Sequence, residues 1–235
     1  MVLFNDPAVY EFVRGPLASL AFMVCGLGFV FQIIRFRLLT KNADWPSAGY
    51  PDTRPQLLLR QPHTFRLRLM YAFIGVKSTA IGRQPVMTLV SFVFHGCLFF
   101  APLLLVGHNI LLNESFGVSL FSLSEKTCDR MTVLFMACVL FFLMRRLFLA
   151  RVRAISSFYD YLVLALAFMP FLTGFLAYHQ IYNYRTIIIL HMFSGELMIM
   201  ALPYTKLMHA IYFFFMRFVL PGESSFKRGK RVWNT

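Results

Sequence analysis

Four histidines in two apolar segments are the residues best suited to bind a metal-containing cofactor. His191 and His209 lie 18 residues apart in the apolar segment 186–216. At about 100° per residue this spacing is five whole helical turns, so both rings would share one face, roughly 27 Å apart along the axis. Two neutral imidazoles at different depths of one face suit two stacked metal centres, and the large centre that such helices usually hold is haem.

The second pair, His95 and His108, lies in the apolar segment 84–113. Their spacing of 13 residues gives a net rotation of about 220°, so an ideal helix would not present both rings from one face. Pro102 lies between them and predicts a proline kink or a π-bulge that re-aims His108. Matching the depths of the four residues predicts two bis-histidine sites, His95 with His209 near the inner membrane face and His108 with His191 near the outer face.

Long apolar helices must position these histidines. The 235 residues are 58% hydrophobic and only 14% charged, more apolar than a soluble domain of this size needs. Five segments are long enough to cross a bilayer core of about 30 Å. They are residues 15–34, 84–113, 131–150, 161–184 and 186–216.

We therefore expect an all-α integral membrane protein built as a five-helix transmembrane bundle. Residues 1–36 would hold the first helix, and 37–84 a cytoplasmic loop with an amphipathic segment at 65–81. Residues 85–217 would form a four-helix di-haem core, and 218–235 a basic cytoplasmic tail. The first apolar segment starts late and follows acidic residues, so we expect no cleaved signal peptide.

The net charge of +13 is distributed unevenly along the chain. Lys and Arg concentrate after the first, third and fifth spans, whereas the opposite loops hold only Lys126, Arg130 and Arg185. By the positive-inside rule, the N-terminus lies outside, in the periplasm, and the C-terminus in the cytoplasm. We attribute the charge to topology and contact with membrane lipid, and expect no nucleic-acid partner.

The cysteine pattern narrows the cofactor chemistry. Cys25, Cys97, Cys128 and Cys138 form neither a CxxC nor a CxxCH motif. This argues against covalently attached c-type haem, zinc sites and thiol redox chemistry. We expect all four to act as small apolar side chains.

Two charges inside the last span need partners, because a charged residue in a span costs about 2.5 to 3.5 kcal/mol on insertion scales. Lys206 precedes His209 by one turn, where its ammonium could meet a haem propionate; the alternative is a surface lysine. Arg145 and Arg146 are weaker candidates for the same propionate contact. Glu196 could relay protons, or could satisfy a hydroxyl such as that of Thr173.

Several motifs between residues 85 and 216 resemble the di-haem cytochrome b γ subunit of respiratory nitrate reductases. They are Phe94-His95, Val106-Gly107-His108, Arg145-Arg146-Leu147-Phe148, Arg151-Val152-Arg153, His191, Gly195, Pro203, Lys206 and His209. The length, the region from Asp6 to Asp52 and the Gly195-Glu196 pair are more similar to the membrane anchors of the Tmc and Hmc electron-transfer complexes of sulfate reducers. The nitrate reductase pattern has its second-helix histidines closer together than His95 and His108 are here.

The resemblance implies that the four matched histidines bind two b haems. It further implies electron transfer between menaquinone or a periplasmic multihaem cytochrome c and a cytoplasmic iron–sulfur subunit resembling heterodisulfide reductase. Such complexes lie in the bacterial cytoplasmic (inner) membrane. Related γ subunits oxidise quinol near the outer haem, close to a lysine at the start of the third helix. Here the candidates are Lys126, Asp129 and Arg130, with Tyr178 and His179 from the next hairpin; a solvated rim explains each equally well.

Two other functions remain open at this point. The chain could be a haem-bearing anchor without a quinone site of its own, whose main task is docking. It could instead be a proton- or metal-coupled transporter that uses the histidines and Glu196. Whether the chain takes part in catalysis beyond electron transfer within an oxidoreductase complex is left open.

Overall fold

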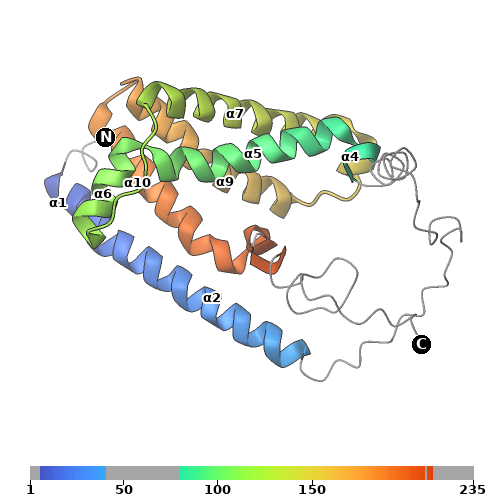
Figure 1. Ribbon diagram of the computed structural model, residues 1–235, viewed down its shortest axis with the longest axis horizontal. Coiled ribbons are helices and arrows are strands. Elements are labelled where there is room, and N and C mark those ends of the chain that lie inside the picture. Colours follow the sequence, from blue (N-terminus) through green and yellow to red (C-terminus); the bar gives the residue numbers. More distant parts are fainter. Residues whose placement is uncertain (1–5, 41–79, 210, 214–235) are drawn as a thin grey trace, which may run out of the picture. The chain divides into compact units, whose positions relative to one another are not determined.

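The computed structural model describes residues 6–40, 80–209 and 211–213, and these residues form helices and no strand. Five of the described helices are long and apolar enough to cross a membrane (Figure 1). They are Pro7–Leu39, Pro85–Leu104, Glu125–Phe148, Phe158–Tyr178 and Tyr184–Tyr204. The prediction of an all-α chain with five membrane-length helices is confirmed, while the orientation stays a prediction. The amphipathic segment 65–81 and the tail 218–235 lie outside the described residues.

The chain divides into two compact units, residues 1–44 with 143–235 (the first unit) and residues 45–142 (the second unit). In the first unit, α1 (Pro7–Phe12) is capped by Asp6, whose side chain accepts a hydrogen bond from the Ala8 N–H at 2.9 Å. A π-helical turn, Val13–Leu17, surrounds Pro16, which has no N–H to donate. The helix continues as α2 (Ala18–Thr40).

Two helices of the first unit, α9 (Phe158–Tyr178) and α2, pack against the last span. α9 and α10 (Tyr184–Ala201) pack against each other, and α10 also packs against α2. A capping box of Ser157 and Asp160 begins α9, and the Asn183 side chain caps α10. Buried apolar side chains of α9 and α10 form the core of this unit: Val163, Ala167, Phe171, Ile187 and Ile189.

The last span is not one continuous helix. α10 ends at Ala201 and is followed by two 3₁₀ turns, Leu202–Tyr204 (η4) and Lys206–Met208 (η5). Between them Thr205 is extended, with φ −117° and ψ −178°, and its hydroxyl caps the second turn by accepting from the Leu207 N–H. Pro203 cannot donate to the helical ladder, which favours an end to the helix here. The prediction of a single helix over 186–216 is wrong, and with it the argument that His191 and His209 share one face.

Helix α2 approaches this break closely. A Cβ added at Gly28 would lie 2.5 Å from the Pro203 Cγ, so only glycine fits here, whereas a Cβ at Gly26 would meet nothing within 4 Å. The Gln32 side-chain amide donates to the Pro203 carbonyl at 2.8 Å and accepts from the Tyr212 hydroxyl at 3.2 Å. Contacts with α2 therefore stabilise the irregular end of the last span.

The second unit contains α4 (Ala80–Arg83), α5 (Pro85–Leu104), α6 (Val106–Phe116) and most of α7 (Glu125–Phe148). Leu105 is extended and separates α5 from α6, and Gly117 ends α6 with a φ of +66°. The predicted interruption between His95 and His108 is present, as a full break three residues after Pro102 rather than a kink or a π-bulge. The last residues of α7 belong to the first unit, where the short α8 (Ala150–Arg153) follows.

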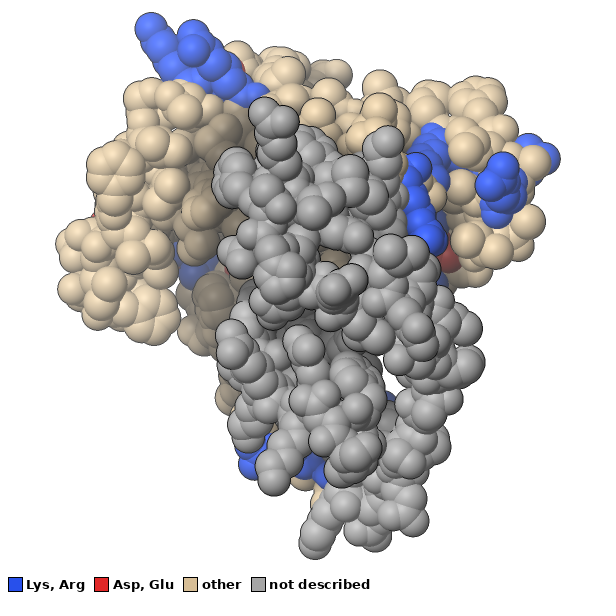
Figure 2. Space-filling view, turned by 45° about the vertical axis from the view of Figure 1, so that its right-hand side comes forward, with Lys and Arg blue, Asp and Glu red and all other residues tan. Residues whose placement is uncertain are grey.

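The surface of the described helices is largely apolar. Large side chains such as Phe31, Phe92 and Phe158 are exposed, and Figure 2 shows a face on which uncharged residues predominate and Lys and Arg form small groups. All four cysteines are buried and none is in a disulfide. Their prediction as apolar side chains agrees with this burial, and the exposed apolar residues fit contact with lipid.

Candidate functional site

All four candidate histidines direct one ring nitrogen, Nδ1, at a backbone carbonyl. A carbonyl oxygen can only accept, so Nδ1 carries the proton, and in the neutral ring the lone pair is on Nε2. The distances from Nδ1 to the carbonyl oxygen are 2.7 Å for His95 to Ser91, 2.8 Å for His108 to Pro102, 2.9 Å for His191 to Pro170 and 2.7 Å for His209 to Lys206.

His95 lies in the regular part of α5, one turn after the serine whose carbonyl it contacts. Its ring meets Phe94 edge-on, with ring centroids 5.1 Å apart. Phe94 in turn stacks on Phe135 at 4.8 Å and meets Phe142 at 5.2 Å, both from α7. The His95 ring therefore lies beside an aromatic cluster within the second unit.

His108 reaches back across the break at Leu105. The carbonyl that it contacts belongs to Pro102, six residues earlier, a separation that regular helical geometry does not bring together. The side chain of Asn109, which is 4% exposed, hydrogen-bonds to backbone groups around the break. Its amide donates to the carbonyls of Leu103 and Leu105 at 3.1 and 3.3 Å, and its oxygen accepts from the Leu120 N–H at 2.9 Å.

His191 is held by the neighbouring helix α9 rather than by its own helix. Besides the Pro170 carbonyl, its Nδ1 lies 3.4 Å from the Thr173 hydroxyl. Gly174 makes room for the ring, because a Cβ there would lie 3.0 Å from the His191 Cε1. The buried hydroxyls of Thr173 and Ser194 lie 3.2 Å apart and complete a polar cluster at this helix contact.

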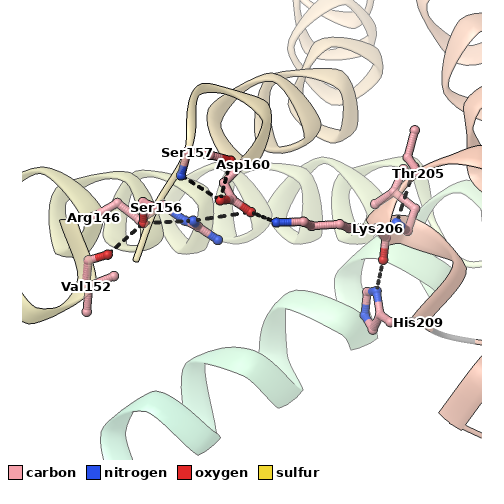
Figure 3. A network of polar contacts seen from close by, with 9 residues as sticks. Arg146, Val152, Ser156, Ser157, Asp160, Thr205, Lys206 and His209 are labelled. Atoms are coloured by element: carbon pink, nitrogen blue, oxygen red, sulfur yellow. Dashed lines mark hydrogen bonds and ion pairs between the residues drawn. The ribbon is translucent and has the colours of Figure 1, made fainter. Parts of the chain in front are cut away.

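His209 follows the second 3₁₀ turn, and the residue that orients it is itself in an ion pair. The Lys206 ammonium lies 2.6 Å from the Asp160 Oδ1 at the start of α9 (Figure 3). Asp160 is 9% exposed, and its Oδ2 accepts from the Ser157 N–H at 2.9 Å and from the Ser157 hydroxyl at 3.0 Å. Arg146 lies 3.9 Å from the same Oδ1.

The contact of Lys206 with Asp160 was not predicted. The sequence did contain one signal for it, since Ser157 and Asp160 have the spacing of a capping box and so mark a fixed carboxylate. The lysine, 46 residues further along, could be matched to that carboxylate only in the folded chain. The propionate roles of Lys206, Arg145 and Arg146 stay predictions.

Glu196 is buried in α10, with 7% exposure. Its Oε2 has no hydrogen-bond partner among the described residues. The Thr173 hydroxyl instead donates to the Met169 carbonyl at 2.7 Å and contacts Ser194, so the predicted bond between Glu196 and Thr173 is not seen in this part of the chain.

Comparison with known proteins gives one relative of nearly equal length. No protein-family model and no solved structure matches the chain. A protein of Nitratidesulfovibrio vulgaris is 31% identical over 223 residues, which are 94% of this chain and 96% of that protein. The chain belongs to the family of that protein. The shared length shows that the family includes proteins of this size.

The remaining site residues of this family member lie at the ends of two spans. Lys126, Asp129 and Arg130 lie in the first two turns of α7, in the second unit. His179 caps the end of α9 in the first unit, and its ring packs on Phe175 at a centroid distance of 4.3 Å. A quinone site that combines these residues stays a prediction.

The predicted histidine pairs each join one residue from each unit. His95 and His108 belong to the second unit, whereas His191 and His209 belong to the first. The pairing therefore stays a prediction. Within the described ranges, no group of three or more His, Cys, Asp or Glu side chains could hold a metal ion.

Proposed function

We propose that the chain is a membrane cytochrome b subunit that binds two b haems through His95, His108, His191 and His209. The common hydrogen bonding of the four rings carries this proposal. Histidines that bind metals almost always donate their other ring N–H to a carboxylate, a backbone carbonyl or water, which fixes the tautomer and orients the ring. All four rings share this arrangement, although each finds its carbonyl in a different way.

The residues present fit the needs of bis-histidine haem. Each iron would take two protein ligands, so four neutral imidazoles with lone pairs on Nε2 are the donor set for two haems. When bound, haem supplies reversible one-electron chemistry. The protein orients the ligands and provides apolar walls, of which Phe94 and Phe135 beside His95 are an example.

We infer that the chain carries electrons across the bacterial inner membrane. The donors and acceptors proposed are menaquinone or a periplasmic multihaem cytochrome c on the outer side and a cytoplasmic iron–sulfur subunit on the inner side. Three observations support this role: the five membrane-length helices, the resemblance to γ subunits and Tmc/Hmc anchors, and a relative from a sulfate reducer. The quinone-side candidates are Lys126, Asp129, Arg130 and His179.

Purified protein in sealed proteoliposomes tests this function. Ferricyanide is trapped inside, and a menaquinol analogue or the impermeant reductant dithionite is added outside. We expect trapped ferricyanide to be reduced at a rate that falls to the protein-free level in His191→Ala, while His179→Ala retains its rate with dithionite. Reduction by dithionite alone would identify a haem-bearing anchor without a quinone site. Ferricyanide that stays oxidised with both reductants would contradict electron transfer across the membrane.

A second candidate function is proton-coupled transport, and the carboxyl of Glu196 favours it. An ionisable residue buried in a span is a candidate functional site by default, and Oε2 has no partner in the described part of the chain. Purified protein without an absorption band in the visible region would favour transport over the cytochrome. If the purified protein contains haem and Glu196→Gln does not change its rate of electron transfer, Glu196 takes no part in electron transfer.

A further inference from the structure

The ion pair between Lys206 and Asp160 joins two elements that are far apart in the sequence. It connects the start of α9 to the 3₁₀ turn that precedes His209, and its two partners are 46 positions apart in the sequence. At 2.6 Å it is a charge-assisted hydrogen bond, the stronger class of such contacts. It therefore ties the irregular end of the last span to a regular helix.

The Asp160 end of this contact is fixed. Its carboxylate accepts two hydrogen bonds from Ser157 within the capping box, and Arg146 approaches it at 3.9 Å. Arg146 is itself held, because it donates to the Ser156 hydroxyl at 3.2 Å, and that hydroxyl donates to the Val152 carbonyl at 2.8 Å (Figure 3). Asp160 is thus an acceptor whose carboxylate is oriented by several polar contacts at the first turn of α9.

The Lys206 end of the contact is next to the candidate ligand. Lys206 offers its ammonium to Asp160 and its backbone carbonyl to the Nδ1–H of His209, at 2.6 and 2.7 Å. Regular α-helical hydrogen bonding is interrupted here, since α10 ends at Ala201, η5 is only three residues long, and α-helix is assigned again only from His209. Short 3₁₀ turns have poorer hydrogen-bond geometry than α-helices, so a side-chain tether contributes more here.

We propose that Asp160 is a positioning residue for His209 and acts through Lys206. The carboxylate fixes the lysine, the lysine fixes the direction of its own carbonyl, and the carbonyl sets the tautomer and orientation of the imidazole. This inference rests on the proposed function, because it explains how an axial ligand is held at a broken helix end. It gives Lys206 a role that does not need a haem propionate.

The experiment compares Asp160→Asn and Lys206→Met, singly and combined, in the full-length haem protein. Asp160→Asn retains a side-chain oxygen for the capping box but removes the negative charge that holds the Lys206 ammonium. Lys206→Met retains the backbone carbonyl that contacts His209 but removes the ammonium. Arg153→Gln is the matched control, because Arg153 is an exposed cation of the same unit and its guanidinium donates to the Leu147 carbonyl at 3.3 Å.

Two readouts follow the haem that is lost in His209→Ala: its midpoint potential and its rate of transfer to apomyoglobin. Second-shell changes typically weaken metal binding by 10- to 100-fold, so we expect each single variant to lose this haem roughly 10-fold faster. A less oriented, less basic imidazole favours the ferrous state, so both variants should raise the potential. The double variant should change the midpoint potential and the rate of haem loss by no more than the larger of the two single variants does. Arg153→Gln should match wild type in both.

Charge effects alone predict a different result. Removing the carboxylate would raise the potential and removing the ammonium would lower it, because the two groups have opposite charge. Opposite shifts, or no shift in Asp160→Asn, would overturn the positioning role. A Lys206→Met effect without any Asp160→Asn effect would instead support a direct contact of Lys206 with the haem, and would also overturn it.

Hydrogen exchange separates this inference from the proposed function. In full-length protein, Asp160→Asn should increase exchange of the backbone amides of residues 206–209, while Asp160→Glu, which retains the carboxylate, should remain near wild type. If wild type holds two haems and Asp160→Asn changes neither exchange nor haem retention, only the positioning role fails. If wild type holds no haem, the proposed function fails, and the role of Asp160 as a positioning residue for a haem ligand fails with it.

Discussion

Two membrane-length helices, Pro85–Leu104 and Tyr184–Tyr204, are each followed by an extended residue and then by a candidate histidine. In the span of α5 and α6, Pro102 is followed by extended Leu105 and then by His108. In the last span, Pro203 is followed by extended Thr205 and then by His209. In both cases a proline lies two or three residues before a single extended residue, and the histidine follows that residue within four positions.

The two breaks differ in how they are stabilised. The break at Leu105 is stabilised by nearby neutral groups, since the Asn109 amide donates to the carbonyls of Leu103 and Leu105 and the Leu123 N–H donates to the Leu104 carbonyl at 2.8 Å. The break at Thr205 depends on distant elements, namely Asp160 of α9 and Gly28 of α2. His108 is therefore positioned by its own segment, whereas His209 is sensitive to changes far from it in the sequence.

Double substitutions of the histidines have the largest expected effect. Each predicted pair joins one histidine after a break with one in a regular helix, His209 with His95 and His108 with His191. We expect the double variant His95→Ala/His209→Ala to retain one haem per chain, because both substitutions empty the same site. His191→Ala/His209→Ala should retain none. Haem is counted by the pyridine haemochrome assay, and one remaining haem in the second variant would show that the pairing is wrong.

Gly28→Ala tests the dependence of the second break on α2. The added methyl group would lie 2.5 Å from Pro203 and 2.9 Å from Tyr204, so α2 must move away from the break. Overpacking of this kind costs about 1 to 3 kcal/mol. We expect a lower thermal unfolding temperature in detergent and faster loss of the haem bound by His209. Gly26→Ala, two residues earlier with open space around it, is the control. Equal behaviour of the two variants would argue against this contact.

Asn109→Ala tests the local repair of the first break. The substitution leaves two carbonyls and the Leu120 N–H without their partner, and an unsatisfied buried polar group costs about 1 to 3 kcal/mol. We expect a lower unfolding temperature and selective loss of the haem bound by His108, whereas the haem of His209 is retained. Loss of both haems to the same degree would show that the two breaks are not independent.

Glu196→Leu has the smallest expected effect and the opposite sign. It replaces a buried carboxyl whose Oε2 has no partner in the described residues with an apolar side chain of similar size. Removing an unsatisfied polar group should raise the free energy of unfolding by about 1 to 3 kcal/mol at most. Thermal unfolding in detergent measures this. A marked loss of stability would mean that Glu196 binds a group in the assembled protein.

The sequence predicted the spans well because hydrophobicity and length are local properties. The apolar runs around His95 and Cys138 identify their helices directly. The break at Thr205 was missed because the hydrophobic run continues through it, so Pro203 was the only local signal. The extended conformation there depends on contacts with Gly28 and Gln32, which no local pattern contains.

The candidate site was predictable in its residue types and not in its contacts. Histidine in an apolar segment is a recognisable signal, and the Nδ1 atom of each of the four lies within 2.9 Å of a backbone carbonyl oxygen. The partners could be read only from the folded chain: His191 contacts a carbonyl 21 residues away, and Lys206 contacts Asp160. The apolar expectation for the four cysteines needed no such information, since composition and spacing sufficed.

The most direct test of the central claim is the number of b haems per chain in purified full-length protein, measured by the pyridine haemochrome assay together with a reduced-minus-oxidised spectrum. Four histidines whose Nδ1–H groups are all held by carbonyls predict two haems per chain with the spectrum of bis-histidine ligation. Protein that purifies folded, with no haem, would contradict the assignment of these rings as axial ligands.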